Sequence, residues 1–410
     1  MQMRWWLACV GWLVLAASGA SAQDLKSYLE SDFRYAIAGK EGTESGVINR
    51  FENTLGMATY LEGDFLAAAI DLRVSYFGGD LGSFGDLMAN NADFPPRARL
   101  EAPALYIEAF DLLPGVDLRV GRQIVEWGSA DMFNPTSVVN SLDLEDPLKF
   151  GARVPNQMAV LTWNAGITVE SDDGELLFDE LALSLVAIPF FQPSWLPKSG
   201  RAAFTDPSLM DVQFDSQALR TMARLNDAFA NAGGSLEYDL LSEQLQASAE
   251  NMQYGARLTM NAVGVNIGLS FFSGFSDIVY PDDIGISLGH PDPETAALQE
   301  GIMLNNNLAD SEEVDNLIGL IEGPIGETLQ ETSVTTKIVL KNPRIHMLGA
   351  DLSTSLDALG GIGFWAEAAV FFHEKLVRDI QAGSEAVEEL VDPNTAFVKL
   401  TAGLDYTIAK

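Results

Sequence analysis

Polar and apolar residues alternate strictly along several short segments of the chain. In residues 70–76, apolar side chains fall on one face of an extended chain, and Asp71, Arg73 and Ser75 fall on the other. Because successive side chains of a strand point to opposite faces, this period of two predicts β-strands with one apolar and one polar face. The same pattern recurs in three later segments, residues 254–260, 265–271 and 398–406.

About twelve strands are predicted from this pattern and its turn residues. Pro343 lies inside the longest of them and cannot donate to a strand ladder, so a bulge or bend is expected there. The strands are expected near residues 30–39, 51–61, 65–77, 98–112, 116–127, 157–170, 179–189, 250–261, 264–275, 332–356, 362–373 and 395–408.

The connections between these strands alternate between short turns and long loops. The long ones span roughly residues 78–97, 129–156, 190–249, 276–331 and 374–393. A soluble β-sandwich also alternates along its strands but has no reason to collect its long loops at one end. Short periplasmic turns and long outer loops are typical of an antiparallel transmembrane β-barrel of the bacterial outer membrane. The predicted fold is therefore all-β, and an exported soluble β-protein is the alternative.

Two of the long loops carry a helical pattern. Apolar residues recur at helical spacing at Leu219, Met222, Leu225 and Phe229, within 214–250. A second set lies among acidic and polar residues within 294–330, at Leu298, Met303, Leu317 and Leu320. We expect helical insertions that pack on the barrel rim; a plug or lid over the lumen is the alternative.

The N-terminus predicts export. Arg4 precedes an apolar run over residues 5–17, and small residues over 18–22 form a cleavage pattern. A signal peptide over residues 1–22 is therefore expected, followed by one barrel domain over 23–410. Cys9 is the only cysteine and lies inside the signal, so no disulfide is expected. The sequence stops at Lys410, just after the last predicted strand over 395–408, and lacks a terminal aromatic residue, which predicts either missing hairpins or a twelve-stranded barrel.

The chain is strongly acidic, with 58 Asp and Glu against 24 Lys and Arg and a formal net charge of −34. This charge argues against nucleic-acid binding, which needs a basic surface. Solvated acidic loops explain the excess, and a vestibule that attracts cations is the sharper alternative. Calcium could bind the acidic runs 143–146 and 282–283, but neither has the spacing of a known calcium loop. No other cofactor is implied.

The densest motif runs from Val120 to Thr136. Alternation through Leu118 and Val120 places Asp117 and Arg119 on the polar face, whereas Arg122 would face lipid unless a bulge near Gly121 or a position near the interface intervenes. We expect the two arginines to meet carboxylates such as Glu108, Glu126 or Asp117. Such contacts form either a ladder of charges across the lumen or a constriction that selects solutes.

The residues Gly121-Arg122-Gln123, Trp127-Gly128 and Asn134-Pro135 together resemble a group of proteobacterial porin-like outer-membrane barrels of unknown function, distantly similar to alginate-export-type barrels. The resemblance covers residues 115–165 and 332–408. It implies a barrel and a pore, and it implies no substrate.

We therefore predict a pore for passive transport of small solutes, narrowed where loop 129–156 folds inward. A gated channel for hydrophobic molecules and a non-conducting structural or adhesive barrel are the alternatives. Such a barrel would contact outer-membrane lipids and lipopolysaccharide and be inserted by the barrel-assembly machinery. Only three histidines are present and none suggests a catalytic triad, so no enzyme is expected. The pore-lining candidates are Asp71, Arg73, Glu108, Asp117, Arg119, Arg122, Gln123, Arg257, Glu367 and Lys399, with Trp127, Asp131, Asn134 and Pro135 in the motif loop.

Overall fold

The structure is a computed structural model, and it is built almost entirely from β-strands. It describes residues 21–35, 48–78, 98–130, 133–144, 149, 151–170, 176–195, 224–242 except 226 and 230, 245–277, 279–290, 292, 294, 311–323, 333–356, 361–382 and 385–406. No helix in these ranges is long and apolar enough to cross a membrane.

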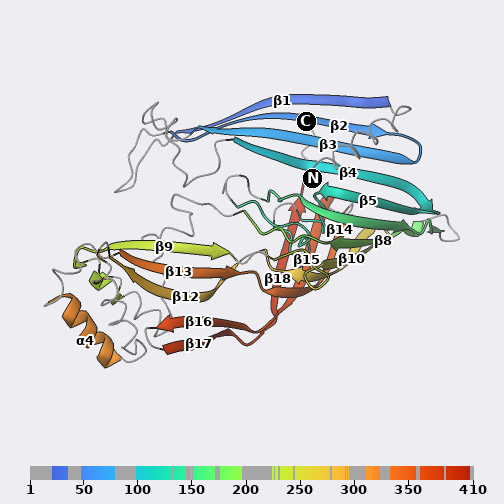
Figure 1. Cartoon of the computed structure of the whole chain (residues 1–410). Coiled ribbons are helices and arrows are strands. Elements are labelled where there is room, and N and C mark those ends of the chain that lie inside the picture. Colours follow the sequence, from blue (N-terminus) through green and yellow to red (C-terminus); the bar gives the residue numbers. More distant parts are fainter. Residues whose placement is uncertain are drawn as a thin grey trace.

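Thirteen strands form one large antiparallel sheet (Figure 1). The order of its strands is β1-β2-β3-β4-β5-β6-β8-β10-β11-β14-β15-β18, with β7 paired to β8. Their bounds are β1 Ser21–Tyr35, β2 Ile48–Glu62, β3 Leu66–Gly78, β4 Ala98–Leu113, β5 Val116–Gln123, β6 Asn156–Asn164, β7 Val169–Glu170, β8 Leu176–Ile188, β10 Gln253–Ala262, β11 Val265–Phe275, β14 Arg344–Leu356, β15 Ile362–His373 and β18 Phe397–Asp405.

The twelve strands of this order correspond to the twelve that the alternation predicts, with differences at their ends. The first strand starts at Ser21 instead of near residue 30. The predicted strand over 332–356 ends at Lys341 and resumes at Arg344, so it is interrupted at Pro343 as expected. The structure thus shows the all-β class and the antiparallel sheet, and its described pairings do not join β1 to β18.

A second sheet of five strands has the order β17-β16-β12-β13-β9. Three of its strands lie within two to four residues of β11, β14 and β15 along the chain, so this sheet extends from the long-loop end of the large sheet. The sequence predicts loops here, which is wrong for β9, β12, β16 and β17. The bounds are β9 Ser235–Ser242, β12 Tyr280–Gly289, β13 Ser333–Lys341, β16 Leu376–Ala382 and β17 Glu385–Asp392.

Helical residues follow the predicted pattern where the structure describes them. Helix α4 covers Ser311–Ile321 and buries Leu317, and the helical residues around 224–231 bury Leu225 and Phe229. An ion pair of 2.5 Å between Arg224 Nη2 and Asp315 Oδ1 joins the two segments. The other residues of the predicted pattern lie outside the described residues, except for Leu320, which is exposed on α4.

The two faces of the large sheet differ sharply in chemistry. One face, the apolar face, presents large hydrophobic side chains to the exterior on every strand of the main order from β1 to β18. Leu29, Leu100 and Leu400 are each more than 70% exposed. Other members of this face on the central strands are Val120, Leu185, Leu269 and Leu348.

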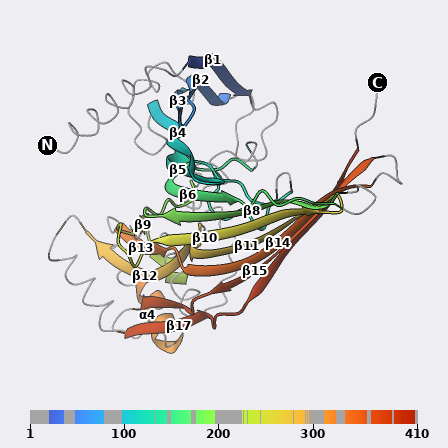
Figure 2. The same ribbon diagram turned by 90° about the vertical axis from the view of Figure 1, so that its right-hand side faces the viewer.

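The opposite face, the polar face, carries the charged residues that alternate with these leucines and valines. Figure 2 shows that the sheet is curved. The polar face also holds the main buried cluster, which lies toward one end of the strands and is formed by Trp127, Val139, Met158, Val160, Val186, Ile188, Phe272, Ile345, Met347, Ala369 and Phe371.

Candidate functional site

The segment between β5 and β6, residues 124–155, is here named the crossing loop, and its described residues include side chains that pack on the polar face. Trp127 is 3% exposed, and its indole packs so closely over Gly255 of β10 that a Cβ there would come within 2.6 Å of the ring. Further along the loop, Thr136 packs in the same way over Gly349 of β14. The inward fold predicted for residues 129–156 is therefore seen in the described part of this loop.

One carboxylate on β15 binds the crossing loop. Glu367 is 3% exposed, and its Oε1 accepts hydrogen bonds from the backbone N–H groups of Ser129 at 2.5 Å and Ala130 at 2.6 Å. Its Oε2 accepts from the hydroxyl of Thr136 at 3.0 Å and from the Thr136 N–H at 3.4 Å. Burying a carboxylate away from water raises the free energy of the folded state unless hydrogen-bond donors replace the lost water, and these four donors do so for Glu367.

The turn predicted at Asn134-Pro135 is present and shapes this binding region. The Ser137 N–H donates to the Asn134 carbonyl at 3.1 Å, which closes the turn. Gly128 has a φ of +89°, and a Cβ there would come within 2.5 Å of oxygens of Asn134, Glu367 and Thr136. Glycine is thus required at this position on both conformational and steric grounds.

Asn140 ties the two ends of the crossing loop together. Its Oδ1 accepts from the Val125 N–H at 2.8 Å, and its Nδ2 donates to the carbonyls of Gln123 at 3.1 Å and Val154 at 2.9 Å. These three hydrogen bonds satisfy backbone N–H and C=O groups that would otherwise bond to water. Nearby, burial lowers the pKa of the Arg153 guanidinium from its ordinary value, while the carboxylates of Asp277, Glu126 and Glu367 oppose that shift.

The crossing loop also contacts β2, a strand near the opposite edge of the large sheet. Lys149 Nζ lies 3.4 Å from Glu52 Oε2 on β2, which is nine strand-to-strand steps from β15. In a flat sheet nine steps would span about 43 Å, close to the ~44 Å that the 13 residue-to-residue steps from Thr136 to Lys149 cover when fully extended. Those residues contain the end of a turn and two β-bridge residues and so are not fully extended, which agrees with the curvature of the sheet in Figure 2.

Ion pairs also lie on the polar face. Arg73 pairs with Asp71 at 2.9 Å and Arg119 pairs with Glu108 at 2.9 Å. These two pairs bring together four residues that the sequence predicts as pore-lining, and the second is one of the expected arginine–carboxylate contacts.

The most buried pair joins β10 to β14. The guanidinium of Arg257 donates to Asp351 through two bonds of 2.7 and 2.9 Å, and Arg257 also donates to the Ser270 hydroxyl at 2.8 Å. Two parallel bonds to one carboxylate fix the orientation of both side chains, so this pair is a rigid feature of the polar face. Asp351 was not predicted, although the alternation of 345–355 places it on this face.

The remaining predicted residues lie in several places. Lys399 lies on the polar face with its Nζ 4.8 Å from the centre of the Phe371 ring, Gln123 is buried and donates to the Met158 carbonyl, and Asp117 accepts from the Asp111 N–H. Arg122 shares the opposite face with Val120, without a register shift at Gly121 in the β5–β6 pairing, and donates to the Ala102 carbonyl at 3.0 Å. Asp131 lies outside the described residues.

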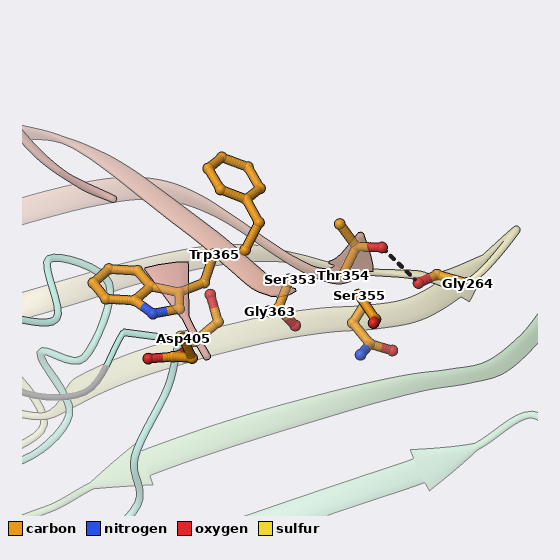
Figure 3. A pocket seen from close by; sticks show the side chains of 11 residues that line it. Gly264, Ser353, Thr354, Ser355, Gly363, Trp365 and Asp405 are labelled. Atoms are coloured by element: carbon orange, nitrogen blue, oxygen red, sulfur yellow. Dashed lines mark hydrogen bonds between the residues drawn. The ribbon is translucent and has the colours of Figure 1, made fainter. Parts of the chain in front are cut away.

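A cavity of about 600 Å³ lies on the polar face beside the crossing loop. Figure 3 shows Trp365 and Asp405 at one end of it and Ser355 and Gly264 at the other. Gly128 and Ser129 of the crossing loop form part of its wall. The Ser129 hydroxyl donates to the Leu352 carbonyl at 3.2 Å, so this wall is attached to β14 as well as to Glu367. The alternation pattern did not reveal this cavity.

The described residues show no group of three or more His, Cys, Asp or Glu side chains placed to hold a metal ion. In the acidic run 282–283, Asp282 accepts a hydrogen bond of 2.7 Å from the Tyr280 hydroxyl and lies 3.9 Å from Lys341 Nζ. Glu145 and Asp146 of the other run lie outside the described residues, so calcium binding there stays a prediction.

Comparison of the chain with protein-family models gave no match, and comparison with curated proteins gave none either.

Proposed function

We propose that the chain is an outer-membrane β-barrel that forms a pore for passive transport of small solutes, narrowed by the crossing loop. The observation that carries the proposal is the two-faced sheet. An apolar face exposed across twelve strands is far larger than the patches that soluble monomers tolerate, and lipid is the environment that suits it.

The polar face supplies the second half of the proposal. Its alternating ion pairs suit a water-filled lumen, and the contacts of the crossing loop with both Glu52 and Glu367 support a sheet that curls around a common interior. The loop narrows that interior because it occupies the space between β2 and β15. The short strand-to-strand turns face the periplasm in this arrangement, and the second sheet lies on the outer side.

The test is ion conductance of the full mature chain in planar lipid bilayers. We expect discrete channels that favour cations, because the chain is strongly acidic. A protein that folds, as judged by heat-modifiable mobility in detergent gels, but carries no current would support the non-conducting structural barrel instead. A reversal potential that favours anions would contradict the proposed selectivity alone, and a chain that stays soluble without detergent would refute the membrane assignment.

A further inference from the structure

The cavity beside the crossing loop has walls suited to a particular class of solute. The hydroxyls of Ser129 and Thr354 in its wall donate to the backbone carbonyls of Leu352 and Gly264. Its other polar side chains are the amide of Asn266, the hydroxyls of Ser353 and Ser355 and the carboxylate of Asp405. Hydroxyl and amide groups both donate and accept hydrogen bonds, whereas a carboxylate accepts only. None of the described residues that line the cavity is cationic, so an anion would meet a carboxylate without a counter-charge.

One wall of the cavity is an aromatic platform. The indole of Trp365 lies over Gly403 of β18, where a Cβ would come within 2.2 Å of the ring, so the ring occupies the place of the absent side chain. Asp405 lies beside this indole in Figure 3. An aromatic surface next to groups that donate and accept hydrogen bonds is matched by a ring that has a C–H face and hydroxyl groups at its edge.

We propose that this cavity is a binding site for a neutral sugar along the path of the pore. The sugar ring stacks on Trp365, and its hydroxyls bond to Asn266, Ser353, Ser355 and Asp405. The volume of about 600 Å³ lies within the range of about 300–1,000 Å³ that small-molecule sites occupy. The proposal rests on the proposed function for its position in a transport path, but sugar binding itself requires no current.

The site also depends on the crossing loop. Gly128 and Ser129 form part of the cavity wall and are held in place by Glu367 and the Leu352 carbonyl. The same loop that narrows the lumen therefore completes the sugar site. The cavity therefore lies beside the loop that narrows the proposed pore.

The test is saturation-transfer NMR on the full mature chain in detergent, with D-glucose and sucrose as probes and with gluconate and choline as charged comparison solutes. We expect transfer to the two sugars only. Trp365→Ala and Asp405→Asn should each weaken sugar binding about tenfold, a loss of about 1.4 kcal/mol. Trp163→Ala, which removes an indole of β6 on the apolar face, is the matched control and should leave binding unchanged.

The other outcomes test the sugar site and the pore separately. Transfer to choline or gluconate in place of sugar would assign the cavity to an ion, and equal sugar binding by Trp365→Ala and the unmodified chain would place the sugar elsewhere. A chain that conducts ions but shows no transfer to either sugar would leave the pore standing and refute the sugar site. A chain that binds sugar at this site but conducts no ions would refute only the pore.

Discussion

Glu367 shows how one buried side chain can fix the position of a long loop. Its two oxygens accept four hydrogen bonds from residues that lie more than 230 positions earlier in the chain. The alternation of the sequence places Glu367 on the polar face, but its partners could not be predicted, because no local pattern links a strand residue to N–H groups that distant. Asn140 is a similar case, since its contacts depend on the shape of the folded loop.

The substitution Glu367→Gln should loosen the crossing loop. The glutamine amide accepts hydrogen bonds only through its oxygen. Either the donors of Ser129 and Ala130 or those of Thr136 therefore lose their acceptor. Leaving buried donors unpaired costs about 1–3 kcal/mol. We expect faster proteolytic cleavage within residues 129–144 and a larger single-channel conductance.

Glu388→Gln on β17 is the control, because Glu388 is exposed and lies in the second sheet. Unchanged cleavage and conductance in Glu367→Gln would show that the loop is held by the packing of Trp127 instead.

At the scale of elements, small residues of the sheet and large residues of the crossing loop fit one another. Gly255 and Gly349 lie on strands where alternation would permit any small or polar residue, yet Trp127 and Thr136 occupy the space above them. Neither Gly255 nor Gly349 was identified from the sequence. A glycine within a strand often marks the close approach of another segment, so the glycines at 255 and 349 were themselves the signal in the sequence that a loop packs there.

Gly255→Ala tests this fit. The added methyl group would lie 2.6 Å from the Trp127 ring, so the indole must move out of the buried cluster. We expect a loss of about 1–3 kcal/mol in stability, as for overpacked cores, together with a red shift of tryptophan emission.

Gly285→Ala on β12 is the matched control, since its added methyl group would meet only Gln381 at an ordinary 3.7 Å. If the two variants behaved alike, Trp127 would not be the residue that anchors the loop on the sheet.

The strands missed from the sequence all lie in the second sheet, where two of the pairings are parallel. β9 and β13 pair in parallel although they are separated by about ninety residues, and β12 pairs in parallel with β16. β12 begins with Tyr280-Pro281-Asp282-Asp283, which is typical of a turn, and in β9 the alternation covers only residues 236–240 before Leu241 interrupts it. Strands of the large sheet mostly pair with sequence neighbours and alternate strongly, so they could be predicted from local pattern, as was β13, whereas β9, β12, β16 and β17 could not.

For the whole molecule, the contrast between the two faces of the large sheet is the dominant property. Twelve strands contribute to both faces, so the exposed apolar surface is continuous and not a local patch. The alternation predicts this contrast from sequence alone, because the period of two directly determines which side chains share a face. It does not predict the closure of the sheet, which depends on contacts between distant strands.

Leu185→Lys distinguishes a lipid-facing surface from a water-facing one. Leu185 is 42% exposed near the middle of the sheet order on β8. On a water-exposed surface such a substitution changes the free energy of unfolding by about 0.5 kcal/mol at most. A lysine at the membrane midplane lowers it by about 2–4 kcal/mol. We expect a lower folded fraction in lipid vesicles titrated with urea.

Leu390→Lys on β17 provides the comparison, because Leu390 is similarly exposed but belongs to the second sheet. Equal stability of both variants would argue that the apolar face is covered by something other than lipid.

The bonds between Glu367 and the crossing loop also set an order of events in folding. The loop leaves β5, yet its acceptor is synthesised 238 residues after Ser129. Contacts of such long sequence separation form late, because the intervening chain must first lose its conformational freedom. The apolar side chains of the loop, above all Trp127, therefore remain without their final partners until β14 and β15 have joined the sheet. Docking of the loop thus marks the completion of the sheet, and the slowest phase of refolding should be the one that buries Trp127.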